Sequence, residues 1–400
     1  MKVLLIKLYC LLHQIVKRLL GRLTIKQHIS LFTTQRDLGV DANDAENAWL
    51  TFIRKSIVSD DHNNAGLHYA GYIYEEKSWC LPSWIWTSAA QVRMWCSLGR
   101  IEEACQLVEL LQNRQQACGG WIVRNDYDQY GNAVPVLAPN DSAYIANNAF
   151  VELYKTTGNV AFLETAERCA QWIMETARPD GMVYVGFDIN KNNWQKGHNI
   201  VDVGFTAALF ARLLEETGKL EYKSFLIQFV NKYIELYFIQ KKHGFATSLD
   251  KNDKQLGGMF ARGQAWALEG LIPAYRVLKD DHIRVVISET IETLLSEQHK
   301  DGSWAYNLTR PLMGNDCKAV SVIAKNMMEW YAMKQDSRII ESARRALQWC
   351  RQHTAKTGEG KGGIYSFCME GAIVQQLYTS TAFVYASSYA IELKHQIEKV

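Results

Sequence analysis

The sequence has few of the residues that divide chains into domains or bind metals. Only 6 of its 400 residues are proline, and no linker rich in Pro, Gly or Ser separates one part of the chain from another. We therefore expect one large domain. The sequence contains no Cys-x-x-Cys and no His-x-x-x-His pair. This absence argues against a zinc site, and we predict that the protein uses no metal and no cofactor.

Neither sign of charge dominates the composition. The formal net charge is +2, which gives no basic stripe for a phosphate backbone, so we predict no nucleic-acid partner. The nine cysteines are scattered and odd in number, which is typical of reduced and mostly buried thiols. This cysteine pattern predicts a cytoplasmic protein.

The first 40 residues are expected to form a flanking segment that contains a basic amphipathic helix. Residues 3–20 are rich in apolar side chains, but Lys7, His13, Lys17 and Arg18 interrupt them, which excludes a membrane-spanning helix. No small-residue cleavage site follows, as a secretory signal peptide would require. Two interpretations stay open: residues 1–22 lie on the inner face of an anionic membrane, or they pack on the flank of the main domain, residues 41–400.

A turn made of glycine followed closely by an aromatic residue recurs along the chain. The glycines of successive turns are 58 to 63 residues apart, and a degenerate copy at Gly66 precedes the first turn by 54 residues. Six turns predict six structural repeats. Glycine tolerates the positive φ that ends a helix, so each turn is expected to terminate one. The five regular turns contain Gly120, Gly181, Gly244, Gly302 and Gly363.

Each turn separates two kinds of predicted helix. The helix before a turn is amphipathic, as in 161–177, and is typical of an outer layer. The helix after it is apolar or small nearly all round, which indicates burial on both sides. The pattern predicts an all-α domain, an (α/α)6 toroid of six hairpins whose longer connections gather at one mouth, where we expect the functional site. The predicted inner helices are 84–98, 141–154, 202–214, 263–278, 316–333 and 379–393.

Asp141 and Asp202 are the strongest catalytic candidates. They are 61 residues apart, one repeat, so they are predicted to begin adjacent inner helices and to face each other across the mouth. When two carboxylates lie close together, the pKa of one rises, which suits general acid–base catalysis near neutral pH. The alternative is that both cap their helices, since aspartate accepts hydrogen bonds from the N–H groups at a helix start.

Arg262 and Gln264 lie at the start of the fourth inner helix, where both could meet a sugar carboxylate. The surrounding run, Phe260 to Leu268, resembles the Trp-Ala-Arg-Gly-Gln-Ala-Trp signature of unsaturated glucuronyl hydrolases and the related unsaturated rhamnogalacturonyl hydrolases. These families are six-hairpin glycosidases, (α/α)6 barrels with an aspartate at the start of two successive inner helices. A later inner helix begins with Asp-Ser-Ser-Ala in the families and with Asp316-Cys317-Lys318-Ala319 here.

The resemblance implies a glycoside hydrolase that acts on an oligosaccharide or polysaccharide and releases a terminal uronic acid-type sugar. Asp202 would protonate the C4=C5 double bond of an unsaturated uronic acid and activate the water that adds at C5, and Asp141 would orient the substrate. Arg262 and Gln264 would bind the acidic group. The other implied or candidate substrate-binding residues are Trp266, Trp194, Lys196, His198, Trp304 and Tyr306.

The sequence also departs from the family pattern. Phe260 replaces the first Trp of the signature, and the His that the families carry after the third outer turn has no counterpart in 245–248. These changes leave open a saturated sugar, which the same two carboxylates could hydrolyse directly.

Two other classes of protein remain as alternatives. The run Glu297 to Trp304 is similar to a repeat of terpene cyclases, although the Asp-x-Asp-Asp acid of those enzymes is absent from the sequence. A non-catalytic glycan-binding or assembly protein of a polysaccharide-biosynthesis system would share the fold. Carboxyl oxygens of Asp141 and Asp202 within a sugar ring's reach of one another would favour an enzyme, whereas burial of both as helix caps would favour such a scaffold.

Overall fold

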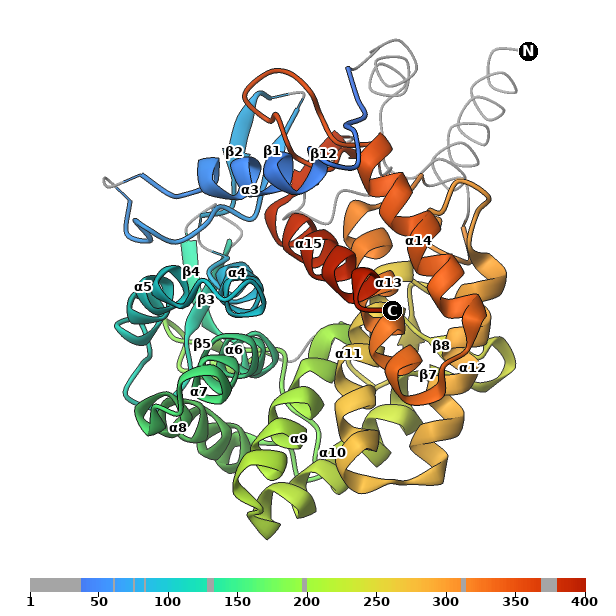
Figure 1. Ribbon diagram of the computed structural model, residues 1–400. Coiled ribbons are helices and arrows are strands. Elements are labelled where there is room, and N and C mark those ends of the chain that lie inside the picture. The colour runs from blue at the N-terminus through green and yellow to red at the C-terminus, as the bar shows by residue number, and fades with distance from the viewer. Residues whose placement is uncertain are drawn as a thin grey trace, which may run out of the picture.

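The computed structural model describes residues 37–59, 62–74, 76–82, 84–127, 133–195, 200–310, 314–367 and 380–400. The expected amphipathic helix within residues 1–22, and the candidates Lys196 and His198, lie outside these ranges. The described chain is a barrel of helices arranged in two concentric rings (Figure 1). The predicted all-α (α/α)6 toroid is confirmed.

The inner ring has six helical members in the described residues. Each packs on the next, and α15 packs on α4, which closes the ring. Most predicted inner helices agree within three residues, but residues 380–383 form a strand before the last one. The members are α4 (Thr87–Ser97); α6 (Pro139–Ile145), which continues through the π-helical turn η1 (Ala146–Val151) into α7 (Glu152–Thr157); η2 (Val201–Gly204) with α9 (Phe205–Thr217); α11 (Ala261–Leu278); α13 (Cys317–Lys334); and α15 (Val384–Glu398).

The outer helices each bury one face against the inner ring. In α14, Ile339, Ala343, Ala346 and Cys350 are buried while the opposite face meets solvent, which is the spacing of an amphipathic helix. The same pattern predicted 161–177, and the helix is observed there as α8. The outer helices are α3 (Ala45–Lys55), α5 (Ile101–Gln112), α8 (Val160–Thr176), α10 (Leu220–Tyr237), α12 (Asp281–Glu297) and α14 (Ser337–Gln352).

One end of the barrel, which we call the return end, consists of short connections from an inner helix to the next outer helix. A residue with a positive φ, between 53° and 72°, ends the inner helix at each of five such connections. Three are glycine and two are not, so the left-handed conformation matters more than the residue type. The five residues are Gly99, Gly158, Gly218, Lys279 and Gln335.

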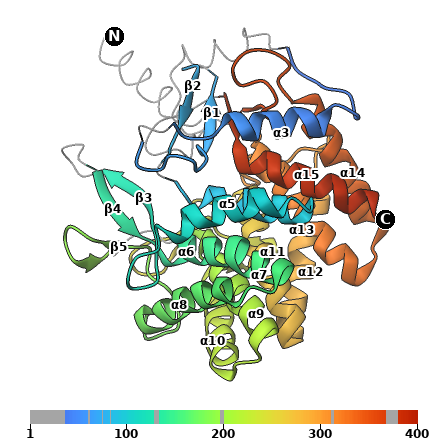
Figure 2. The ribbon, with the colours of Figure 1, turned by 60° about the vertical axis from the view of Figure 1, so that its left-hand side comes forward.

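The opposite end, the mouth, carries the longer connections and their short antiparallel strands. In Figure 2 the strands lie on the left, away from the C-terminus. One sheet has the order β3-β4-β5-β6 and another the order β11-β12-β1-β2, while β7 pairs with β8 and β9 with β10. The strands are β1 (Gly71–Ile73), β2 (Ser78–Cys80), β3 (Ile122–Tyr127), β4 (Ala133–Leu137), β5 (Phe187–Asp188), β6 (Asn193–Trp194), β7 (Phe238–Ile239), β8 (Gly244–Phe245), β9 (Ser248–Leu249), β10 (Gln255–Leu256), β11 (Ser366–Phe367) and β12 (Ser380–Phe383).

The repeated glycine turns lie at the mouth, after the outer helices. Gly181 and Gly302 have a positive φ as expected, but in the Gly119-Gly120 pair the first glycine has it. In the third turn His243 adopts φ 48° in place of glycine. A Cβ atom added at Gly302 would lie 2.2 Å from the Arg345 carbonyl oxygen, so close approach to the next outer helix, as well as φ, requires glycine there.

Candidate functional site

Asp141 and Asp202 both lie at the mouth, in the first turns of neighbouring members of the inner ring. Asp141 is the third residue of α6 and is 3% exposed, and Asp202 is the second residue of η2 and is half-buried. Helix α6 packs against both η2 and α9. The two aspartates therefore occupy nearly equivalent places in successive repeats, as the sequence predicted.

Neither aspartate is an N-cap residue. The N-cap positions of α6 and η2 are Ala138 and Ile200, and neither helix has a side-chain cap. By contrast, Asp316 is the N-cap of α13, where it accepts a hydrogen bond from the Lys318 N–H. A capping role in the strict sense thus describes Asp316 and not the two catalytic candidates.

Both carboxylates have defined neighbours. Oδ1 of Asp141 accepts a hydrogen bond of 3.0 Å from the Asn140 side chain. The negative charge of Asp202 lies close to the Tyr233 phenol, whose pKa is held well above its ordinary value first by burial and then by that charge. Tyr233 donates a hydrogen bond to the Val201 carbonyl, so the outer helix α10 fixes the main chain beside Asp202.

Arg262 joins three segments of the mouth. It is the second residue of α11, and its Nη1 donates a 2.7 Å hydrogen bond to Oδ2 of Asp316. Its Nη2 lies 3.3 Å from the Tyr306 hydroxyl, and the rings of Phe260, Trp266 and Tyr306 surround the guanidinium at 5.0–5.4 Å. Arg262 is only 5% exposed, so its first anionic partner is a carboxylate of the protein itself.

A second cation lies beside the same carboxylate. Lys318 is 4% exposed, and its Nζ is 3.7 Å from Oδ2 of Asp316 and 3.7 Å from the centre of the Phe383 ring. Among the described residues this buried cluster therefore contains two basic side chains and one carboxylate. Sequence reasoning placed Asp316 and Lys318 on an inner helix but assigned neither of them to the site.

Two of the residues expected to bind substrate, Gln264 and Trp304, are buried and form hydrogen bonds with the main chain instead. Gln264 is fully buried, and its amide group bonds the main chain of Phe245 in both directions, at 2.6 and 2.9 Å. Trp304 is also fully buried and donates from Nε1 to the Leu294 carbonyl. These positions differ from the sugar contacts expected from the sequence, because neither side chain has a polar surface left to present to a ligand.

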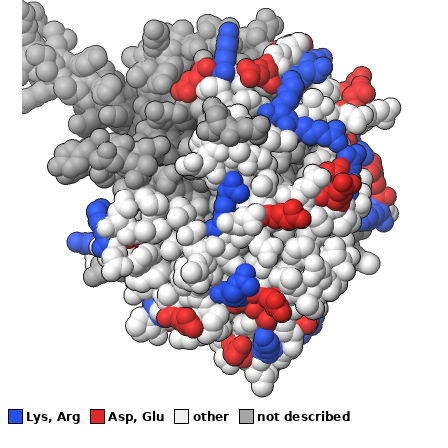
Figure 3. Space-filling view, turned by 90° about the vertical axis from the view of Figure 1, so that its left-hand side faces the viewer, with Lys and Arg blue, Asp and Glu red and all other residues white. Residues whose placement is uncertain are grey.

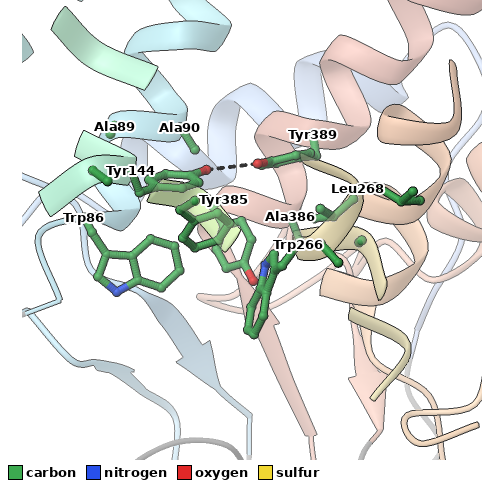
Figure 4. Packing of buried hydrophobic residues seen from close by; sticks show 14 of the residues in the cluster. Trp86, Ala89, Ala90, Tyr144, Trp266, Leu268, Tyr385, Ala386 and Tyr389 are labelled. Carbon is green, nitrogen blue, oxygen red and sulfur yellow. Dashed lines mark hydrogen bonds between the residues drawn. The ribbon is translucent and has the colours of Figure 1, made fainter. Parts of the chain in front are cut away.

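Near the mouth the inner ring contributes an aromatic floor, which comprises Trp86, Tyr144, Phe205, Trp266 and Tyr385. Figure 4 labels Trp86, Tyr144, Trp266 and Tyr385 of this group. The rings contact one another with centroid separations from 4.7 Å, between Tyr144 and Phe205, to 6.4 Å. Tyr144 lies one helical turn after Asp141. Of these five residues the sequence analysis assigned only Trp266 to the site. When a helix is apolar all round, its sequence does not indicate which aromatic side chains face the mouth.

The Tyr385 hydroxyl has no hydrogen-bond partner among the described residues, although the side chain is only 2% exposed. Burial, followed by the charge of Asp316, holds the pKa of this phenol well above its ordinary value. A neutral phenol remains a hydrogen-bond donor at physiological pH. Tyr385 therefore supplies a buried donor to the aromatic floor.

Trp194 belongs to a separate aromatic group at the rim. It lies in β6, half-buried, and its ring is 5.1 Å from that of Tyr184 and 5.2 Å from that of Phe187. Tyr306 is 2% exposed and contacts Arg262. The structure thus brings together Arg262, Trp266 and Tyr306, and leaves Trp194 with its own aromatic neighbours.

The described residues show no sign of a metal centre or of a membrane span. No cluster of three or more His, Cys, Asp or Glu side chains within them could hold a metal ion. None of the helices in these ranges is long and apolar enough to cross a membrane. On the face drawn in Figure 3, basic and acidic side chains are interspersed over a mostly uncharged surface, apart from a run of basic side chains at the upper right.

Comparisons with known proteins identify the fold. No family model matches the sequence, and no curated protein matches it. A solved unsaturated glucuronyl hydrolase specific for heparin is 16% identical with a TM-score of 0.69, covering 90% of this chain and 99% of that one. The unsaturated glucuronyl hydrolase of Bacillus sp. GL1, responsible for the degradation of glycosaminoglycan, is 15% identical with a TM-score of 0.66 over 89% and 97%.

A GH76 α-mannanase of Bacteroides thetaiotaomicron is similar at 12% identity, with a TM-score of 0.64 and coverage of 90% and 96%. At these identities the likeness shows the fold alone. The chain has the six-hairpin architecture of these glycosidases, over nearly its whole length and theirs, as the resemblance in the sequence implied.

Proposed function

We propose that the protein is a glycan-active hydrolase that releases a terminal uronic acid-type sugar from an oligosaccharide at the mouth of the barrel. The observation that carries this proposal is the placement of Asp141 and Asp202. Both begin neighbouring members of the inner ring, neither is an N-cap, and both lie at the end that carries the aromatic floor. The similar fold of several glycosidases supports the same class of activity.

Asp202 is the proposed acid and base. Its half-buried carboxyl group can exchange protons with solvent, whereas the more deeply buried Asp141 suits the role of orienting partner. On an unsaturated uronic acid, Asp202 would give its proton to C4 of the double bond and then take one from the water that adds at C5. The resulting C5 hemiketal opens by breaking its bond to the ring oxygen, which leaves a ketone at C5 and a hemiacetal at C1. The hemiacetal then breaks its bond to the neighbouring sugar, which leaves with a hydroxyl group while C1 becomes an aldehyde.

The rest of the mouth would bind and orient the sugar. Trp86 and Trp266, the most exposed rings of the aromatic floor at 8% each, can cover the apolar face of a sugar ring. We assign the recognition of the acidic group to the buried cluster of Arg262, Lys318 and Asp316, because its two basic side chains favour an anion in a place of low dielectric constant. Gln264 and Trp304 would support this arrangement without touching the ligand.

A panel of lyase-generated unsaturated oligosaccharides tests the proposal. We expect the ultraviolet absorbance of the double bond to disappear with at least one of them, and to persist with the Asp202→Asn variant. A matched panel of saturated uronic acid oligosaccharides, followed by detection of the released sugar, tests the direct hydrolysis that the departures from the family pattern leave open. If neither panel is cleaved but one is bound, the protein is a glycan-binding scaffold and the proposed enzyme activity is wrong.

A further inference from the structure

The return end of the barrel contains a cavity of about 200 Å³ that the proposed reaction does not use. Side chains from all the inner helices, α4, η1 with α7, α9, α11, α13 and α15, form its walls. Ser97 and Lys399 at its rim are exposed, so the cavity is open to solvent. The mouth, with Asp141 and Asp202, lies at the other end of the same helices.

The walls of this cavity are strongly polar and their charges cancel. They carry four Arg or Lys side chains and four Glu side chains. Arg93 is at the centre of the pairs: its Nε is 3.1 Å from both carboxylate oxygens of Glu392, and its Nη1 is 3.0 Å from Oε1 of Glu269. A second cation, Lys325, pairs with Glu329. The network is therefore neutral overall.

Two polar atoms of this network lack a partner within the described part of the chain. Nη2 of Arg93 and Oε2 of Glu269 are both buried, and the Glu269 side chain is only 6% exposed. Buried donors and acceptors in folded proteins are nearly always hydrogen-bonded, so the wall behind the cavity holds two unmet polar groups. Because both atoms are closed off from the cavity, an occupant would bond to the other polar side chains of the lining.

The helix that lines one wall has an irregular turn at this place. Residues 146–151 form a π-helical turn in the middle of an otherwise α-helical inner segment, and Asn147 and Asn148 both line the cavity. Asn148 is held in place, since its Oδ1 accepts from Arg93 and its Nδ2 donates to the Tyr144 carbonyl. Such π-helical turns are frequent at functional sites.

We infer that the return-end cavity is a second binding site, for one small uncharged polyhydroxylated molecule of the size of a monosaccharide. Each hydroxyl group both donates and accepts, which matches a wall where Glu oxygens alternate with guanidinium and amide groups. A charged ligand would disturb a network whose charges already cancel in a place of low dielectric constant. The volume corresponds to about six or seven water molecules at roughly 30 Å³ each, which suits a single sugar ring.

Calorimetric titration of the full-length chain with neutral hexoses (glucose, galactose and mannose), with glucuronic acid and with glucosamine tests this inference. We expect saturable binding, one molecule per chain, of at least one neutral hexose, and weaker binding of the two charged sugars. Glu269→Gln should weaken the binding at least about tenfold, as expected for loss of a hydrogen bond to a charged group. Arg212→Gln also changes the wall. The ion pair of Arg212 with Glu215 is long, at 3.7 Å, so its loss should disturb the fold less. This variant keeps the test valid if Glu269→Gln fails to fold.

Asp202→Asn is the control that separates the two ends, and it should leave this binding unchanged. The inference is overturned if no neutral hexose binds, or if the charged sugars bind as tightly. It is also overturned if binding is insensitive to the wall variants but lost in Trp266→Ala, because the sugar would then occupy the mouth. None of these results depends on turnover, so the inference stands or fails separately from the proposed enzyme activity.

Discussion

At the mouth, the inner helices carry aromatic rings and two aspartates that no N-cap role explains, whereas at the return end the same helices carry paired Arg, Lys and Glu side chains. The connections differ in the same way, since the mouth has long segments with short strands and the return end has tight turns. A helix in a closed ring is buried along its length, so its sequence can vary most at its two ends. The barrel therefore offers two chemically distinct places on one scaffold.

The two ends are also in contact through hydrogen bonds. The hydroxyl of Tyr144, in the aromatic floor, is 3.0 Å from that of Tyr389, which donates a 2.6 Å hydrogen bond to Glu269 in the wall of the return-end cavity (Figure 4). Single substitutions and changes of pH can break or sharpen the contrast between the ends.

The largest effect is expected at the mouth, from Asp202→Asn. This change keeps the size of the side chain but removes its ability to cycle a proton, so turnover on a confirmed substrate should fall by roughly 10²–10⁴-fold with substrate affinity largely kept. Steady-state kinetics and circular dichroism of the variant are the measurements. A folded variant with near-normal turnover would remove Asp202 from the mechanism.

Next in size is a pair of glycine variants, one at each end. Gly302 at the mouth has φ 95° and its added Cβ would lie 2.2 Å from a carbonyl oxygen, whereas Gly218 at the return end has φ 67° and open space around it. We expect Gly302→Ala to lower the free energy of unfolding by about 4 kcal/mol, from φ strain plus the clash, and Gly218→Ala by about 1 kcal/mol. Urea denaturation measures both, and equal losses would contradict the structural difference between the two turns.

The pH dependence of stability should also differ between the ends. On the mouth side, burial lowers the pKa of His68 to about 4. Because the unfolded chain binds a proton near pH 6.5 and the folded chain does not, stability is complete above that pH and falls by about 3 kcal/mol between pH 6.5 and 4. Unfolding free energies measured across this range for the wild type and for His68→Asn should show a smaller slope in the variant.

The corresponding group at the return end titrates in a different window. Burial alone would raise the pKa of Glu329, but the charges of Lys325, Arg212 and Arg93, with the hydrogen bond from Lys325, together outweigh burial and lower the pKa to about 2. The stability from Glu329 is therefore complete above pH 4.5 and is lost as the pH falls towards 2. The His68→Asn variant should leave this second loss unchanged; if both losses disappear together, the two groups are coupled and the ends are not independent.

The smallest effect is expected for Asn159→Ala at the return end. Asn159 is the N-cap of α8, and its side chain accepts a hydrogen bond from the Ala161 N–H. Loss of such a cap typically costs about 1 kcal/mol. Urea denaturation should show this loss, whereas Asn159→Asp, which keeps the capping oxygen, should stay close to the wild type.

Much of the fold could be predicted because its signals are local. The 3.6-residue apolar period of α8 and the glycine turns before Trp121 and Trp304 are properties of short segments, and they repeat once per hairpin. The same repeat placed Asp141 and Asp202 at the start of neighbouring helices. The position of the positive φ within each turn was less well predicted, because packing against the next outer helix selects it.

The sequence by itself determined the number of hairpins, their inner and outer layers and the end where the two aspartates lie, since each follows from the order of residues along a helix. Only the tertiary structure decided which side chains meet. Gln264 bonds the main chain of Phe245, Arg262 pairs with Asp316 54 residues away, and Arg93 pairs with Glu392 299 residues away. Such pairs form where helices from different hairpins converge on the barrel axis, and the closure of the ring, which no local pattern encodes, brings them within reach.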